Sequence, residues 1–158
     1  MLLLVRLCWR EWTKIIIIWD AEAEIIRNIY TSQQTRNNHF IWRTNPETEF
    51  FTAEQCYITE VFNQMDRPEA SMAHARVEPG ITTQKHSLQG TAEWYYILQG
   101  TGEMYVNHEV AGQVASGDIV YVPAGTPQQI TNTGNEDLVF LCFCVPRFTP
   151  GAYSEISV

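Results

Sequence analysis

Basic residues are scarce in this chain: ten Lys and Arg stand against eighteen Asp and Glu, and the formal net charge is −8. A nucleic-acid-binding protein needs a basic stripe that neutralises phosphates, and the sequence shows none. Long apolar runs are missing as well. The runs at residues 2–5 and 15–19 are shorter than the apolar region of a secretory signal (about 7–15 residues) or a bilayer span (about 20 residues). We therefore expect no nucleic-acid partner, no membrane partner and a cytoplasmic location.

The four cysteines lack the spacing of a zinc or redox motif, because no C-x-x-C pair occurs among them. Cys142 and Cys144 are two residues apart in an apolar segment, so on a strand they would point to the same face. There each would pack as a small hydrophobic side chain. Unpatterned cysteines in a chain of 158 residues suggest a reducing compartment.

The chain separates into an N-terminal extension, residues 1–35, and one domain, residues 36–158. In the extension, residues 15–19 are strand-like and Asp20 can cap a short helix. The domain carries no long helical pattern and no repeat; it consists of short apolar or alternating segments separated by Gly, Pro and Asn turns. Such segments predict the strands of a sandwich or barrel, here at 56–63, 72–78, 93–98, 102–106, 119–122, 128–132 and 138–145.

Two glycine-bounded segments carry the most specific pattern. Residues 80–100 read GITTQKHSLQGTAEWYYILQG, and residues 117–132 read GDIVYVPAGTPQQITN. They resemble the two motifs of the cupin superfamily, G-x5-H-x-H-x3–4-E-x6-G and G-x5-P-x-G-x2-H-x3-N. Every diagnostic position matches except two, and the departures are Leu88 at the second histidine and Gln128 at the histidine of the second motif. The resemblance implies an all-β fold, a double-stranded β-helix or jelly-roll barrel.

The resemblance also implies a divalent metal, which three imidazoles and one carboxylate hold in this family. Here the candidate ligands are His86 and Glu93, with the amide oxygen of Gln128 as a weaker third contact, whereas Leu88 cannot bind a metal. Fewer imidazoles should lower the affinity and favour harder ions, and the identity of the ion stays open. The alternative is an inherited barrel in which His86 and Glu93 hydrogen-bond each other or a ligand.

Small cupins similar to this chain are often described as sugar or sugar-phosphate isomerases, including mannose-6-phosphate isomerase-like proteins. By that resemblance Glu93 and His86 are the candidate catalytic residues, moving a proton at a carbonyl that the metal polarises. The candidate substrate pocket adds Arg76, Gln84, Leu88 and Tyr95, and either Arg76 or Lys85 would clamp a phosphate or carboxylate.

Two other functions remain open. One is a non-catalytic module that binds a small, carbohydrate-like molecule in the cavity. The other is a metal-dependent oxygenase, against which the loss of two imidazoles argues. We also expect a homodimer, because residues 138–145 are apolar on both faces and the apolar run at 15–19 is hard to leave exposed.

Overall fold

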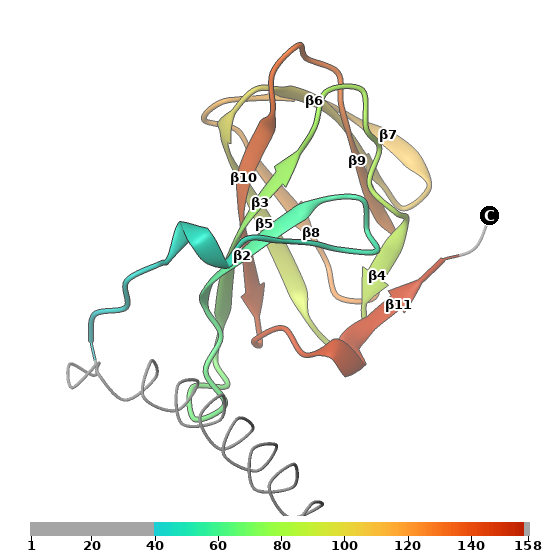
Figure 1. Ribbon diagram of the computed structural model, residues 1–158. Helices are drawn as coiled ribbons and strands as arrows, with labels where there is room; N and C mark the ends of the chain where they lie inside the picture. Colours follow the sequence, from blue (N-terminus) through green and yellow to red (C-terminus); the bar gives the residue numbers. More distant parts are fainter. Residues whose placement is uncertain (1–39, 157–158) are drawn as a thin grey trace, which may run out of the picture. The chain divides into compact units, whose positions relative to one another are not determined.

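The computed structural model describes residues 40–156, and its strands form two antiparallel sheets (Figure 1). The six-stranded sheet has the order β1-β2-β3-β10-β5-β8, and the five-stranded sheet has the order β11-β4-β9-β6-β7. The elements are η1 (Pro46–Thr48), β1 (Phe50–Phe51), β2 (Tyr57–Phe62), β3 (Ser71–Val77), β4 (His86–Leu88), β5 (Ala92–Gln99), β6 (Thr101–Val106), β7 (Glu109–Ala115), β8 (Ile119–Val122), β9 (Gln128–Asn132), β10 (Leu138–Val145), η2 (Pro150–Ala152) and β11 (Tyr153–Glu155).

From β3 onward the chain passes repeatedly from one sheet to the other, so that strands distant in sequence become neighbours. Strand β10 lies between β3 and β5, and β4 pairs with β9. This is the arrangement of a jelly roll, in which two sheets enclose a common interior. The predicted all-β, double-stranded β-helix is confirmed.

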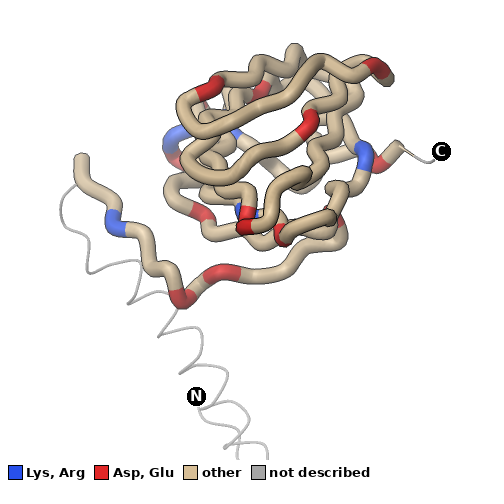
Figure 2. Tube along the Cα trace, turned by 90° about the horizontal axis from the view of Figure 1, so that it is seen from above, with Lys and Arg blue, Asp and Glu red and all other residues tan. Residues whose placement is uncertain are grey.

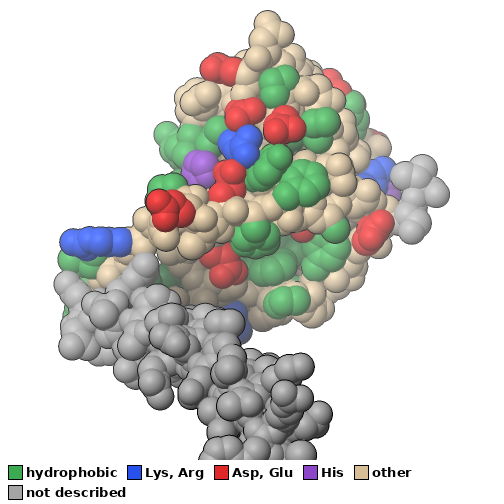
Figure 3. Space-filling model, in the orientation of Figure 1, with side chains coloured by type: hydrophobic (Ala, Val, Ile, Leu, Met, Phe, Trp, Pro, Cys, Tyr) green, Lys and Arg blue, Asp and Glu red, His purple; other side chains and the backbone are tan. Residues whose placement is uncertain are grey.

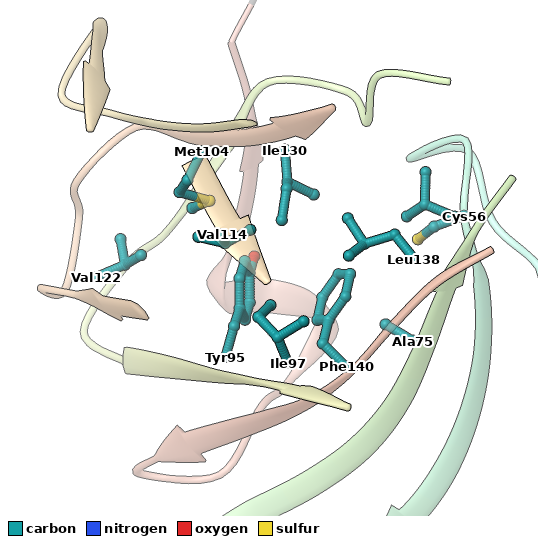
Figure 4. Close-up of a cluster of buried hydrophobic side chains, with 11 residues drawn as sticks. Cys56, Ala75, Tyr95, Ile97, Met104, Val114, Val122, Ile130, Leu138 and Phe140 are labelled. Atoms are coloured by element: carbon teal, nitrogen blue, oxygen red, sulfur yellow. The ribbon is translucent and has the colours of Figure 1, made fainter. Parts of the chain in front are cut away.

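Apolar side chains from both sheets pack together in this interior (Figure 4). The six-stranded sheet contributes Ile97 and Leu138, and the five-stranded sheet contributes Met104 and Ile130; all four are buried. Side chains alternate along a strand, so Tyr95 points inward with Ile97. The same alternation directs further inward positions of β5 and β9 to the polar site described below.

The extension expected at residues 1–35, with its candidate strand at 15–19 and its helix after Asp20, lies outside the described residues, and the division of the chain there stays a prediction. Between residues 40 and 156, no helix has the length and apolarity needed to cross a membrane. Acidic residues are spread along the described part of the trace, with few basic ones among them (Figure 2).

Candidate functional site

The polar site lies where inward positions of three strands, β4, β5 and β9, face each other. His86 begins β4 and pairs in register with Gln128, the first residue of β9, in the five-stranded sheet. Glu93 and Tyr95 lie on β5 in the six-stranded sheet, two residues apart and therefore on one face. All four side chains are buried, and Gln128 is only 1% exposed. The structure thus brings together His86, Glu93 and Gln128, as the motif spacing predicts.

The amide of Gln128 is the centre of a continuous hydrogen-bond network. Its Nε2 donates to Glu93 Oε2 at 2.7 Å and lies 3.3 Å from His86 Nε2. Its Oε1 accepts a hydrogen bond of 2.9 Å from the hydroxyl of Tyr95. Both amide protons and the amide oxygen therefore have partners inside the barrel.

A backbone carbonyl sets the protonation pattern of His86. The Nδ1 atom lies 2.9 Å from the carbonyl oxygen of Gln84. Because a carbonyl can only accept, Nδ1 carries the proton, and Nε2 is left as the acceptor for the Gln128 amide. This hydrogen-bond pattern places a proton on Nδ1, and Gln84 contributes through its backbone.

A cavity of about 220 Å³ lies beside this network. Its wall includes His86, Leu88, Glu93 and Tyr95, all predicted as site residues. Most of the remaining wall is apolar, with Phe140 and Ile130 as examples. Lys and Arg are missing from the described residues that line it. The cavity is therefore a mainly apolar space with a few polar groups, the usual character of a small-molecule site.

Burial disfavours the charged form of the carboxyl groups at this cavity. Burial raises the pKa of Glu93, against the opposing effects of the Gln128 hydrogen bond and of His86. Burial likewise raises the pKa of Glu54, which His86 partly counteracts. The pKa of Tyr95 is raised well above its usual range, again mainly by burial, so its hydroxyl stays protonated and can donate to Gln128. Burial thus works against charge at this cavity, and the hydrogen bond from Gln128 offsets part of that effect for Glu93.

Two residues of the site have no place in the motifs. Glu54 lies in the turn before β2, lines the cavity, and has its Oε2 atom 3.9 Å from His86 Nδ1. Cys144 pairs in register with Glu93, and its thiol lies 3.5 Å from Glu93 Oε1. In the sequence Glu54 looks like any acidic turn residue. Cys144 could be assigned only to a strand face, not to a partner.

Arg76 lies away from the cavity, contrary to its predicted role as a substrate clamp. Its guanidinium donates to Glu49 at 2.7 Å and to Asp137 at 3.1 Å, and it stacks 3.9 Å above the ring of Tyr57. Neighbouring residues of a strand point to opposite faces, so Ala75 faces the cavity and Arg76 does not. The charge of Arg76 is already compensated, and its role here is to tie the turn regions to the sheet.

The donor atoms at the site do not fit a divalent metal. Gln128 turns its amide nitrogen, which cannot coordinate a cation, toward His86 and Glu93, whereas its oxygen faces Tyr95. Leu88 is apolar at the position of the second imidazole. Within residues 40–156 no cluster of three or more His, Cys, Asp or Glu side chains is arranged to hold a metal ion.

Comparison with known proteins agrees with the fold and the motifs. Residues 73–144 match the family model described as "Cupin domain". An uncharacterized protein of Methanocaldococcus jannaschii is 39% identical over 79 residues, which is 50% of this chain and 62% of that protein. The oxalate-binding protein of Thermotoga maritima is 34% identical over 73 residues, 46% of this chain and 60% of that protein. The match thus spans about three fifths of these two relatives.

Solved structures show the same architecture at lower sequence identity. The Streptomyces nucleoside dehydratase Pac13 superposes with a TM-score of 0.61 and 20% identity, covering 73% of this chain and 91% of that protein. At this identity the likeness describes the fold alone. The chemistry of the site must be argued from its own residues.

Proposed function

We propose that this chain, whose residues 73–144 match the cupin domain model, is a member of the cupin superfamily and binds a small uncharged molecule in its cavity. The cavity of about 220 Å³ carries the proposal, because its wall combines apolar side chains with His86, Glu93 and Tyr95. A space of this size holds several water molecules, so it suits a small organic ligand. The apolar part of the ligand would pack on Phe140 and Leu88, and its polar group would lie against Glu93.

The cavity wall has acidic side chains and no described Lys or Arg, and this favours an uncharged ligand. Glu54 and Glu93 are both lining residues, and no Lys or Arg of the described chain joins them. A buried anion without a cationic partner pays a large desolvation cost. Oxalate, which the Thermotoga maritima relative is named for binding, and the sugar phosphates implied by the resemblance would therefore lack a counter-charge here.

A matched pair of ring compounds tests this proposal. Cyclohexanol is expected to raise the melting temperature and to give a calorimetric binding signal, whereas cyclohexanecarboxylate and oxalate give neither. Ala73→Phe, which fills the cavity wall, should abolish the effect. Ala115→Phe, at an exposed position of β7, should retain it. Stabilisation by the two anions and not by the alcohol would contradict the proposal.

An isomerase-like enzyme is the second candidate, and the distance of 3.9 Å between Glu54 Oε2 and His86 Nδ1 favours it. Imidazole and carboxyl groups are the usual groups for moving a proton, and Glu93 completes such a set beside the cavity. In that case Glu93→Gln would still bind ligand but lose turnover, whereas a pure binding module would have no turnover to lose. The oxygenase alternative requires two imidazoles, and His86 is the one histidine among the described lining residues.

Assembly as a homodimer is likewise a proposal, supported by the outer face of the six-stranded sheet. Tyr121, Trp94 and Phe143 form a row of aromatic rings across β8, β5 and β10, with centroids 5.0 and 6.1 Å apart. Ile119 and Tyr96 extend it and are 68% and 46% exposed. Hydrophobic side chains also lie open on the face seen in Figure 3. Exposed apolar surface of this kind marks interaction sites.

Light scattering tests the dimer. At micromolar concentration the mass should be twice 18.2 kDa. Tyr121→Asp, which puts a charge into the aromatic row, should yield the monomer, and Val110→Asp on β7 should not. A wild-type mass of one chain would rule the dimer out.

A further inference from the structure

We propose that the side-chain amide of Gln128 takes the place of the metal ion that the resemblance implies, so that this cupin site is complete without a divalent metal. The inference does not depend on which ligand the cavity accepts. It rests on where the two amide protons and the amide oxygen of Gln128 point.

The amide nitrogen lies between the two side chains that would otherwise be metal ligands. Gln128 Nε2 is 2.7 Å from Glu93 Oε2 and 3.3 Å from His86 Nε2. The lone pairs of these two atoms are the ones that a metal would need from the site. An amide NH2 group, with its two protons, satisfies both acceptors at once. The amide and a metal ion therefore compete for the same electrons.

Neighbouring groups hold the amide in this orientation. The Tyr95 hydroxyl donates to Gln128 Oε1 at 2.9 Å. The bond between His86 Nδ1 and the Gln84 carbonyl keeps the Nε2 lone pair directed at Gln128. Reversing the amide would bring its oxygen against Glu93 Oε2 and its nitrogen against the Tyr95 hydroxyl. A carboxylate oxygen facing an amide oxygen gives no hydrogen bond, so the observed orientation satisfies the larger number of groups.

The network leaves nothing at the site for a metal to satisfy. In the described residues, no buried side-chain nitrogen or oxygen lacks a hydrogen-bond partner. A metal would have to displace Gln128, which is 1% exposed, from three partners. It would then gain one imidazole and one carboxylate, because Leu88 offers no donor. Protein sites for zinc and related ions supply at least three protein ligands.

The first test uses the unmodified chain. Protein purified without a metal-binding tag should contain far less than one equivalent of any divalent metal by elemental analysis. Its melting temperature should not change with EDTA, and titration with Mn²⁺ or Ni²⁺ should give no binding heat. A full equivalent of bound metal, lost to EDTA together with thermal stability, would overturn the inference.

The second test changes only the atoms that are argued to exclude the metal. Gln128→Glu replaces the amide nitrogen by oxygen at almost constant shape, and should create a Mn²⁺ site with His86 and Glu93. Gln128→His with Leu88→His restores the imidazoles of the family motif and should bind Ni²⁺ at one equivalent, with a rise in melting temperature. Gln113→Glu, at an exposed position of β7, is the matched control and should bind neither ion. If these site variants fold and still bind no metal, residue 128 is not what excludes it, and the inference fails.

Discussion

Gly100→Ala is expected to lower the free energy of unfolding by about 3 kcal/mol or more, through two additive causes. Gly100 joins β5 to β6 with φ at +83°, a left-handed conformation that costs other residues about 1–2 kcal/mol. A Cβ atom there would also lie 2.7 Å from the Asp137 carbonyl oxygen and 2.9 Å from Leu138 Cα. These are backbone atoms, so relieving the overlap must shift the start of β10, which adds roughly 1–3 kcal/mol.

Gly90→Ala separates the two causes. Gly90 has φ at +73°, and a Cβ atom there would meet nothing within 4 Å. Its replacement should therefore cost only the conformational part, about 1–2 kcal/mol. Urea unfolding followed by tryptophan fluorescence measures both variants. Equal losses would show that the contact between Gly100 and β10 relaxes without cost, contrary to this expectation.

Gln128→Met is expected to destabilise the chain by about 3 kcal/mol, because it leaves several buried groups without partners. Methionine is close to glutamine in shape, so packing changes little. The Tyr95 hydroxyl, Glu93 Oε2 and His86 Nε2 each lose their bond to the amide. Each orphaned buried group costs about 1–3 kcal/mol, and the partners of one network do not add fully.

Two further variants give the scale for this measurement. Tyr95→Phe removes only the donor to Gln128 Oε1 and should cost about 1–2 kcal/mol. Gln113→Met, at an exposed glutamine that bonds Glu103, should change stability by less than about 0.5 kcal/mol. Thermal and urea unfolding of the three proteins, with the Gln128→Met/Tyr95→Phe double variant, measures the coupling between the two residues. If Gln128→Met left the free energy of unfolding unchanged, Glu93 and His86 would have found other hydrogen-bond partners.

Local sequence patterns predict the positions of most of the long strands of the barrel. The strands expected at 119–122, 128–132 and 138–145 coincide with β8, β9 and β10. Each of these segments is apolar or alternating and is bounded by turn residues, so the hydrophobic pattern and the turn residues predict the same strand boundaries. Strand β7 was not predicted, and neither were the short strands β1, β4 and β11. These three short strands have two or three residues, too few for an alternation to be visible in the sequence.

The convergence of His86, Glu93 and Gln128 on one site could also be predicted from the sequence. The motif spacing places the first two on adjacent segments of the first motif and the third on the second motif. A strand directs alternate residues inward, so residues at the right spacing converge once the sheets close. The strand pattern predicts a sandwich or barrel, and the resemblance to the cupin motifs adds the jelly roll and the identity of these three residues.

The hydrogen bonds and ion pairs that these residues form were decided only by the tertiary structure. From the sequence, the amide oxygen of Gln128 was expected to be a metal ligand. In the structure the amide nitrogen faces Glu93 instead, because Tyr95, on the opposite sheet, donates a hydrogen bond to the oxygen. Likewise, Arg76 was expected to bind a ligand, but in the structure it forms ion pairs with Glu49 and Asp137. Strand periodicity is a local property that the sequence encodes directly. The partner of a polar side chain is set by contacts between residues tens of positions apart, which exist only after the two sheets have packed.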